Sequence, residues 1–236
     1  MLVAIHQLHY LPWLRYIHKI ASCDVFVVLD NIQFNKNGWQ NRNKIKTAEG
    51  SQILTVPVFH KNAQNLDEVL IDSKSPWQRK HWNALNNNYR RAPYFKEYAE
   101  TLQKIYEQPW EKLNDLNYAI FGHLISALRI KTKILRGSDL ALKGEATDRL
   151  IAICKDLGAN AYLTGAYAAE TYLDSSFFER EGIELVMQTY ESPTYPQLFP
   201  KEGFIPELSI VDLLFNCGSK SLDVLLQGHP HDVNTP

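Results

Sequence analysis

The chain has 236 residues, with 25 Lys and Arg against 26 Asp and Glu, 45% hydrophobic residues and 11% aromatic residues. This composition excludes a disordered chain, which would combine low hydrophobicity with high net charge. The formal net charge of -1 gives no overall attraction to nucleic acid. The three cysteines, Cys23, Cys154 and Cys217, form no C-x-x-C pair, which argues against a disulfide framework and against a structural zinc site.

Length and hydropathy also limit the location and the domain organisation. No apolar run approaches the roughly 20 residues of a membrane-spanning helix, and the first residues lack the regions of a signal peptide. We therefore expect a cytoplasmic protein without a membrane span. The pattern predicts a single α/β domain over residues 1–228, with a helical insert at about 74–128 and a flexible tail at 229–236.

The chain opens with a β-α-β pattern. Two apolar runs of strand length, Leu2–His6 and Val25–Phe34, flank the helical segment Trp13–Ala21. Continuous apolar strands joined by a helix predict a parallel sheet that is buried on both faces. The next two runs, Asn43–Thr47 and Ser51–Phe59, are separated by a turn-like Glu-Gly pair and predict a hairpin.

The middle of the chain predicts three helices and the second half predicts more of the parallel sheet. The helices are rich in Trp and Tyr and are separated at Pro93 and Pro109. They are expected at Trp77–Arg91, Tyr94–Glu107 and Trp110–Leu128. The later strands are expected at Lys131–Gly137, Ala161–Gly165 and Ile183–Gln188, with a helix at Thr147–Gly158. The predicted fold class is therefore α/β, a Rossmann-like parallel sheet with a small hairpin and a helical insert.

The first candidate site is the segment H-Q-L-H-Y-L-P-W, which follows the first predicted strand. His6 and His9 stand where a strand ends and a helix begins, in the crevice where doubly wound sheets bind ligands. The start of that helix would also present free backbone N–H groups to a phosphate. The alternative is that His6 is a core residue and that Tyr10, Leu11 and Trp13 pack as a hydrophobic staple.

The second candidate site is the segment from Asp30 to Lys46, after the second predicted strand. It is dense in amides and basic residues and has no acid between Asp30 and Glu49. Amides supply paired donors and acceptors, and guanidinium grips phosphate in a bidentate manner, so such a set suits a nucleotide sugar. Gln33, Asn41, Arg42 and Lys44 are the candidate ligands. The alternative is an ordinary solvated loop and hairpin.

Two further segments carry weaker signals. The stretch from Ser73 to Lys96 interleaves basic and aromatic residues, as nucleic-acid binding requires. The spacing of Trp82, Leu85 and Tyr89 is more typical of a core stripe, so we do not expect nucleic acid as a partner. The strand-to-helix turn at Thr164 and Gly165 would let the backbone approach a phosphate.

Catalytic chemistry has few candidate residues. The cysteines lie in apolar surroundings that raise a thiol pKa, so no nucleophile is predicted. Acid or base chemistry would fall to His9, Asp30 or Glu170, and no set of metal ligands is assigned.

Several motifs together resemble a known family. The run AIHQLHYLPWLRYIHKIASCDVFVVLDNIQF, the later YLTG with Tyr172, YPQLF and LSIVDLLFNCG are similar to the WbqC-like family over roughly residues 1–226. That family is found mainly in bacterial O-antigen and lipopolysaccharide gene clusters. One departure is Leu8, where the family commonly has proline. The resemblance implies a role in surface-polysaccharide biosynthesis and does not bring an established reaction.

A fainter resemblance concerns the order strand, His-containing turn, helix, strand and then Gln33-Phe34. It is similar to the nucleotidylyltransferase-like fold, and to pantothenate synthetase in particular, although the H-x-G-H signature is absent and only His9 could match its first His. Such enzymes activate a carboxylate with ATP, with Mg²⁺ as its partner ion, and pass the acyl group to an amine. The resemblance therefore implies amide formation without a covalent enzyme intermediate.

The leading hypothesis is a transferase or ligase that acts on a nucleotide-activated amino sugar. It would form an amide on the sugar amine, from an amino acid such as glycine and with ATP. His9 and Asp30 are the predicted catalytic residues. The predicted substrate-binding residues are His6, Tyr10, Gln33, Asn41, Arg42, Lys44, Thr164 and Gly165. The alternatives are a non-catalytic protein that binds a nucleotide sugar or glycan, and a nucleotidyltransferase.

Overall fold

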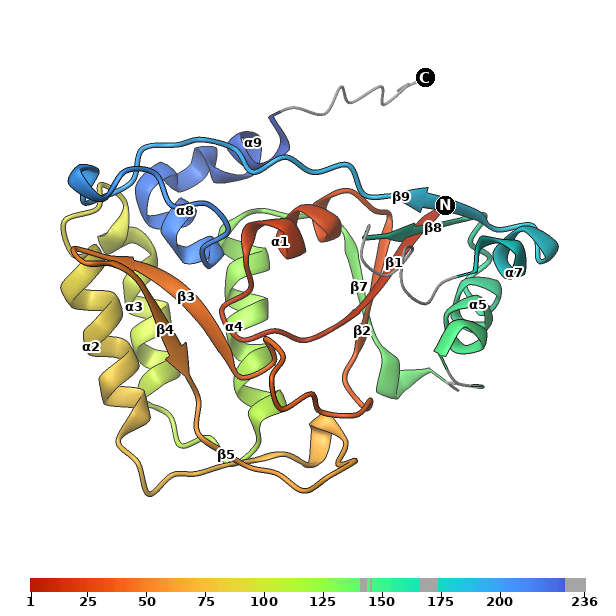
Figure 1. Ribbon diagram of the computed structural model, residues 1–236, viewed down its shortest axis with the longest axis horizontal. Helices are drawn as coiled ribbons and strands as arrows, with labels where there is room; N and C mark the ends of the chain where they lie inside the picture. The colour runs from red at the N-terminus through yellow and green to blue at the C-terminus, as the bar shows by residue number, and fades with distance from the viewer. Residues whose placement is uncertain (141–143, 145, 166–173, 228–236) are drawn as a thin grey trace.

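A five-stranded parallel sheet organises the fold. The computed structural model describes residues 1–140, 144, 146–165 and 174–227 (Figure 1). The strands are β1 (Leu2–Gln7), β2 (Val25–Leu29), β7 (Lys133–Arg136), β8 (Ala161–Thr164) and β9 (Glu184–Met187). Their order is β7-β2-β1-β8-β9, and all pairs are parallel. The predicted α/β class with a parallel sheet is confirmed.

Both faces of the sheet are buried, which explains why the strands are continuously apolar. Successive side chains of a strand point to opposite faces. Val3, Ile5 and Val27 accordingly belong to one core cluster, whereas Ala4 and Phe26 belong to another. The sheet therefore separates two hydrophobic cores, and helices cover each of them.

Different helices cover the two faces (Figure 1). On one face lie α1 (Leu14–Ala21), α4 (Leu113–Ala127) and α8 (Ile210–Cys217), and the other face packs against α5 (Ala146–Asp156) and α7 (Ser175–Arg180). Phe121 of α4 stacks on Phe26 with ring centroids 6.4 Å apart. Phe178 of α7 stacks on Tyr162 at 5.3 Å. Aromatic side chains thus fix a helix on each side of the sheet.

The helical insert is formed by α2 (Trp77–Tyr89), α3 (Phe95–Glu107) and α4, close to the predicted ranges. The third helix begins at Leu113, later than the predicted Trp110. The reason is that the Trp110 indole N–H donates to the carbonyl of Ile105, which closes the end of α3 instead of starting a new helix.

The hairpin differs from the prediction at its second arm. β3 (Arg42–Thr47) pairs antiparallel with β4 (Gly50–Thr55), and Gly50 adopts a φ of 103° at the turn. The predicted arm continued to Phe59, but Pro57 has no N–H to extend the ladder. β5 (Val58–Phe59) instead pairs with β6 (Leu70–Ile71), a strand that the sequence did not reveal.

The remaining elements belong to the described part of the chain. They are α9 (Ser221–Leu226) and four 3-10 turns, η1 (Leu66–Glu68), η2 (Gly137–Asp139), η3 (Pro200–Glu202) and η4 (Gly218–Lys220). Within the described part of the chain, no helix combines the length and the apolar character that a bilayer crossing requires. The predicted tail at 229–236 lies outside the described residues.

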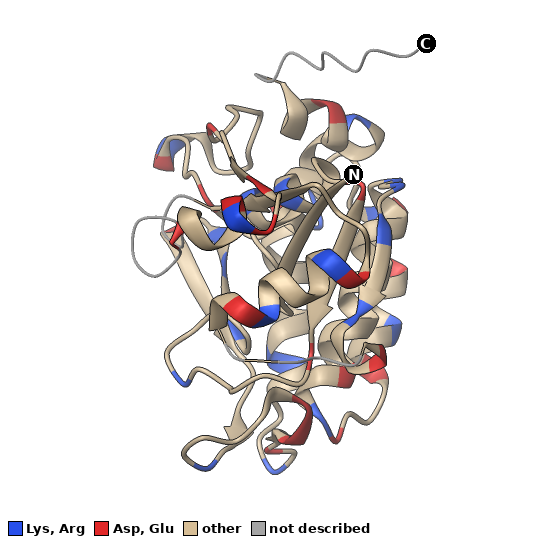
Figure 2. Cartoon of the chain, turned by 90° about the vertical axis from the view of Figure 1, so that its right-hand side faces the viewer, with Lys and Arg blue, Asp and Glu red and all other residues tan. Residues whose placement is uncertain are grey.

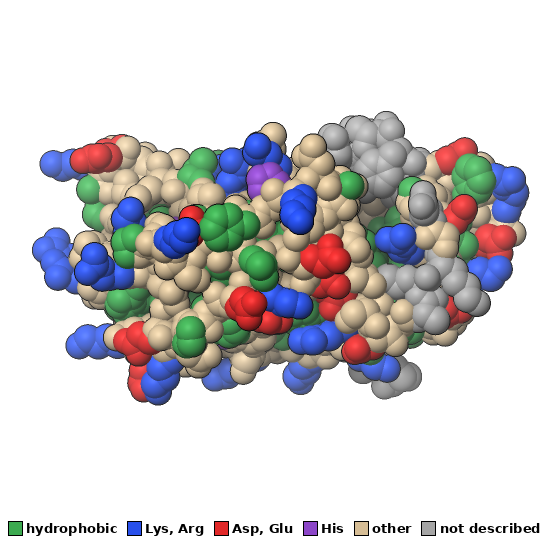
Figure 3. All heavy atoms as spheres, turned by 90° about the horizontal axis from the view of Figure 1, so that it is seen from below, with side chains coloured by type: hydrophobic (Ala, Val, Ile, Leu, Met, Phe, Trp, Pro, Cys, Tyr) green, Lys and Arg blue, Asp and Glu red, His purple; other side chains and the backbone are tan. Residues whose placement is uncertain are grey.

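Charges of both signs are interspersed on the surface. Figure 2 shows Lys and Arg beside Asp and Glu on the face that carries α5 and α7. Figure 3 shows the same mixture, with hydrophobic side chains between the charges, on the face that lies at the bottom of Figure 1. The visible surface therefore matches the near-zero net charge.

Candidate functional site

A cavity of about 620 Å³ opens at the carboxyl end of the parallel sheet. It is lined at the ends of β1 and β8 by Gln7, Thr164 and Gly165, among others. β1 and β8 are neighbours in the sheet, but the chain leaves β1 toward β2 on the opposite side. The cavity therefore lies at the topological switch point, where open α/β sheets bind their ligands.

Aromatic rings form one wall of the cavity, and they come from three segments. Trp13 and Trp39 meet edge to face with ring centroids 4.9 Å apart. The ring of His9 lies 5.2 Å from Trp13 and 4.9 Å from Tyr16. The backbone N–H of Tyr10 donates to the carbonyl of Trp39, which joins the segment after β1 to the segment before β3. Such rings suit stacking on a nucleobase or a sugar.

His6 and His9 lie together in this cavity, as the sequence predicted for neighbours at the end of a strand. Their rings are edge to face, with centroids 4.8 Å apart. Nδ1 of His6 lies 3.1 Å from the carbonyl of Gln7, so Nδ1 carries the proton and Nε2 is the acceptor of the neutral ring. Nδ1 of His9 is buried without a hydrogen-bond partner in the described structure.

Both imidazoles are neutral at pH 7. Burial, and secondarily the charge of Lys19, lowers the pKa of His6 to about 4. Burial also holds the pKa of His9 well below 6.5, and repulsion by the protonated form of His6 and by Lys19 adds to the effect. Each neutral ring keeps a nitrogen lone pair that can accept a proton.

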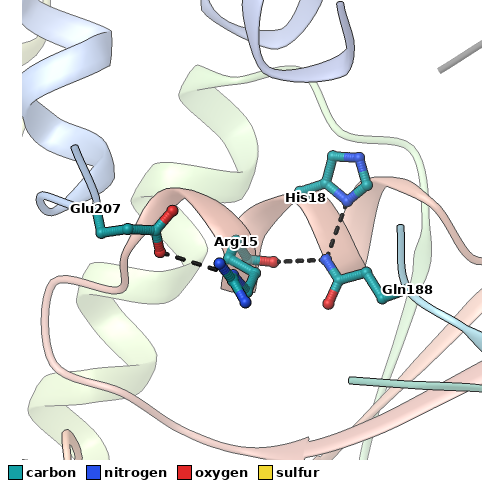
Figure 4. Close-up of polar contacts among 4 residues, drawn as sticks. All are labelled: Arg15, His18, Gln188 and Glu207. Atoms are coloured by element: carbon teal, nitrogen blue, oxygen red, sulfur yellow. Dashed lines mark hydrogen bonds and ion pairs between the residues drawn. The ribbon is translucent and has the colours of Figure 1, made fainter. Parts of the chain in front are cut away.

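Three cations line the cavity, namely Arg15, Lys19 and Lys44. Arg15 pairs with Glu207 at 3.7 Å (Figure 4). Gln188, just after β9, donates to the carbonyl of Arg15 at 3.0 Å, and its amide nitrogen also lies 3.0 Å from Nδ1 of His18 (Figure 4). Gln188 therefore ties the β9 end to α1 and fixes the helix that carries two of the cations.

The amide-rich segment contributes less to the cavity than predicted. Lys44 lines it, whereas Gln33, Asn41 and Arg42 are absent from its lining. Asn41 donates to the carbonyl of Val56, and Gln33 is exposed beside Asn65. The side-chain N–H₂ of Asn41 is thus used to bond the backbone, whereas its Oδ1 is buried without a partner in the described structure.

Arg42 reaches the cavity only through a neighbour. Its guanidinium lies 5.8 Å from the ring of Trp39 and donates to the carbonyl of Asn37. Trp39 lines the cavity, so Arg42 contacts the aromatic wall without lining the cavity itself.

Asp30 lies outside the cavity lining, and its hydrogen bonds join the end of β2 to η2. One oxygen accepts from the backbone N–H of Ser138 at 2.8 Å, and the other accepts from the hydroxyls of Ser138 and Tyr118 at 2.8 and 3.1 Å. The carboxylate is 3% exposed. Its acceptor sites are thus occupied by the protein itself.

Replacing Asp30 with alanine should therefore reduce stability without removing the cavity. The change removes the acceptor of the half-buried Tyr118 hydroxyl and of Ser138, which is exposed, at a cost of about 1–3 kcal/mol in the free energy of unfolding. Asp30→Asn keeps one acceptor and should lose less. Urea unfolding measures the effect. A stable Asp30→Ala protein that had lost only turnover would instead assign Asp30 to catalysis.

The other predicted residues divide between the cavity and the core. Thr164, at the end of β8, and Gly165, directly after it, line the cavity. Tyr10 is fully buried under the helical insert, where its hydroxyl bonds Nδ1 of His81 at 2.7 Å and the hydroxyl of Tyr106 at 2.5 Å. Glu170 and Tyr172 lie outside the described residues.

The basic and aromatic stretch of α2 contributes to the core. Trp77, Leu85 and Tyr89 are buried, and Trp82 stacks on Phe95 at 6.2 Å. These rings are therefore not available for stacking on bases, in agreement with the core alternative.

Nucleophilic and metal chemistry find little support in the part of the chain that the structure describes. Burial raises the pKa of the Cys23 and Cys154 thiols to about 12. No three His, Cys, Asp or Glu side chains gather there closely enough to hold a metal ion.

Several cavity residues were not predicted from the sequence. They are Ile5, Gln7, Trp13, Arg15, Tyr16, Lys19, Trp39, Tyr162, Gln188 and Glu207. Trp13, Tyr16 and Lys19 recur every three residues, which places them on one side of α1. This spacing is the sequence signal that could have placed the three residues at the cavity, because α1 begins shortly after the end of β1.

Comparison with known proteins places the chain in a family. The profile of the WbqC-like protein family matches residues 7–224. A Mycobacterium tuberculosis (strain ATCC 25618 / H37Rv) protein named "Uncharacterized protein Rv1507c" is 38% identical over 230 residues, which cover 94% of this chain and 96% of that protein. No solved structure is significantly similar to the chain. The chain belongs to the WbqC-like protein family.

Proposed function

We propose that this protein is an enzyme of surface-polysaccharide biosynthesis that forms an amide on the amino group of a nucleotide-activated sugar. The proposal rests on the cavity at the switch point, where two neutral imidazoles stand among cations and aromatic rings. Membership of the WbqC-like family supports the pathway.

The lining suits a nucleotide sugar. Arg15, Lys19 and Lys44 supply positive charge for phosphate oxygens, and Glu207 is the single carboxylate among the described lining residues. Trp13 and Trp39 offer apolar faces to a base or a sugar ring. Anionic and aromatic parts of one ligand would therefore both find partners.

The imidazoles suit the proton transfer that amide formation needs. The sugar amine attacks an activated acyl carbonyl, a C–N bond forms, and the bond to the activating group breaks with its electrons on that group. A proton must then leave the nitrogen. Nε2 of His6 is its acceptor, because the hydrogen bond from Nδ1 to the Gln7 carbonyl fixes the ring and leaves Nε2 unprotonated. This assignment replaces His9 with His6 as the base.

ATP would supply the activation, and an amino acid such as glycine would supply the acyl group. The cations and rings of the cavity fit a triphosphate nucleotide as well as a nucleotide sugar. The steps above assign no role to Mg²⁺, which would come bound to the phosphates of ATP.

The test is an incubation of the protein with ATP, glycine and a dTDP-4-amino-4,6-dideoxyhexose, followed by mass spectrometry. An amide product that depends on ATP and on the protein is expected. Related amino acids and UDP-linked amino sugars extend the panel. The absence of an amide across the panel, together with no thermal shift by any nucleotide, would refute the proposal.

A binding protein without turnover is the second candidate. It is favoured by the ion pair of Glu207 with Arg15 and by the hydrogen bonds of Asp30, which engage both carboxylates in the protein. Binding of the nucleotide sugar without any change in its mass would support this candidate.

A further inference from the structure

Among the described residues, Lys19 is a buried cation without a partner. It belongs to α1, is 9% exposed and lines the cavity. The ion pairs of the described residues do not include it, and no described residue forms a hydrogen bond with its amine. Buried ammonium groups are normally paired, because desolvation of the charge is costly. Burial accordingly lowers the pKa of Lys19 to about 8.

The amine lies at the cavity, and its described surroundings contain no unpaired anion. A Cβ atom on Gly165 would lie 3.6 Å from Nζ of Lys19, so the amine lies directly against the glycine at the end of β8. His6 and His9 are near enough for the charge of Lys19 to lower their pKa values. Glu207, the carboxylate of the described lining, is engaged by Arg15. The described neighbours of the amine thus include no free carboxylate.

We propose that Lys19 is the anchor for the diphosphate of the nucleotide ligand, which it holds at the carboxyl end of β8 between Gly165 and His6. This inference rests on the proposed function for the identity of the nucleotide. A diphosphate is favoured over a single carboxylate because Lys44 and Arg15, the latter paired with Glu207, are further cations of the same cavity. The position also agrees with the phosphate site of switch-point sheets.

The anchor would also prepare the base. The charge of Lys19 is one cause of the low pKa of His6. An oxyanion beside Lys19 offsets that charge, so the pKa of His6 rises when the ligand binds. Nε2 then accepts a proton more readily in the complex than in the free protein.

The experiment compares Lys19→Met with the wild type by calorimetric titration at pH 7. Methionine keeps the apolar stem and removes the charge. Lys61→Met is the matched control, since Lys61 is exposed and absent from the cavity lining. The ligands are dTDP, inorganic pyrophosphate, thymidine and acetate. Lys19→Met should weaken dTDP and pyrophosphate by about tenfold or more, leave thymidine unchanged, and melt at a higher temperature without ligand.

The remaining outcomes distinguish failure of the inference from failure of the proposed function. Equal dTDP affinity in the wild type and Lys19→Met overturns the anchor while leaving the proposed function in place. Loss of pyrophosphate binding in Lys19→Met supports the anchor even where the nucleotide sugars give no product. If acetate competes with dTDP and pyrophosphate does not, Lys19 binds a carboxylate, and the assignment of a diphosphate is overturned. A wild type that binds none of the four ligands overturns both.

Discussion

Replacement of His6 by asparagine is expected to lower kcat for amide formation by about 100- to 10,000-fold, the usual contribution of a general base. The asparagine side-chain N–H₂ can still donate to the carbonyl of Gln7, as Nδ1 of His6 does at 3.1 Å. The variant therefore keeps the local hydrogen bond and loses the basic nitrogen Nε2. Initial rates of product formation, measured with saturating substrates, give the effect.

Two further measurements separate catalysis from folding. His60→Asn is the control, because His60 packs on Phe34 and does not line the cavity. It should retain the wild-type rate. The dissociation constant of the nucleotide sugar should change little in His6→Asn, since the proposed role is proton transfer. If His9→Gln abolished turnover while His6→Asn remained active, the base would be His9, as the sequence had suggested.

The parallel sheet was predictable because its signal is local. Val25–Leu29 is an unbroken apolar run, and burial on both faces leaves no other pattern for such a strand. The positions of His6 and His9 followed from the same reasoning, since a residue at the end of a parallel strand must lie at the carboxyl edge. The predicted second arm of the hairpin was wrong beyond Pro57. The next residues form β5, whose partner strand lies eleven or more residues away along the chain.

The cavity could be predicted only in part, because most of it is made by tertiary contacts. The sequence places Lys19 on one side of a short amphipathic helix but does not show what that side faces. Whether its amine meets water or a cavity depends on Gly165, which is remote in sequence. Asn41 and Gln40 illustrate the opposite error, because donors that look free in the sequence are used to hold the loop to Val56 and Gln7. Polar composition alone does not distinguish these uses.

Replacement of Lys46 by methionine is expected to lower the free energy of unfolding by about 3–5 kcal/mol, more than the Asp30 variants. Lys46 is 1% exposed, and its amine donates to Oε1 of Gln197 at 3.0 Å and to the carbonyl of Gly203 at 2.5 Å. The variant removes the donor of both acceptors, of which Oε1 of Gln197 keeps the backbone N–H of Ile205. It also removes a positive charge that acts on Asp212, a fully buried carboxyl that accepts from the Tyr89 hydroxyl at 2.9 Å.

The loss should depend on pH with a defined sign. Burial raises the pKa of Asp212 to about 6, and the Tyr89 hydrogen bond and the charge of Lys46 act against this rise. A raised carboxyl pKa costs no stability below the ordinary value of 3.8 and its full amount above the folded value. Because Lys46→Met raises this pKa further, the variant should lose more stability at pH 8 than at pH 5. Urea unfolding at the two pH values measures the difference.

A double variant connects this network to the cavity. In Lys46→Met with Asp212→Asn the buried charge is gone, so part of the stability should return and the difference between pH 5 and pH 8 should shrink. An equal loss at both pH values would contradict the role of Asp212. Lys46 and Lys44 are two residues apart on β3, and Lys44 lines the cavity. The buried network thus supports the strand that carries one of the cations, and nucleotide affinity should fall with stability in Lys46→Met and recover with it in the double variant.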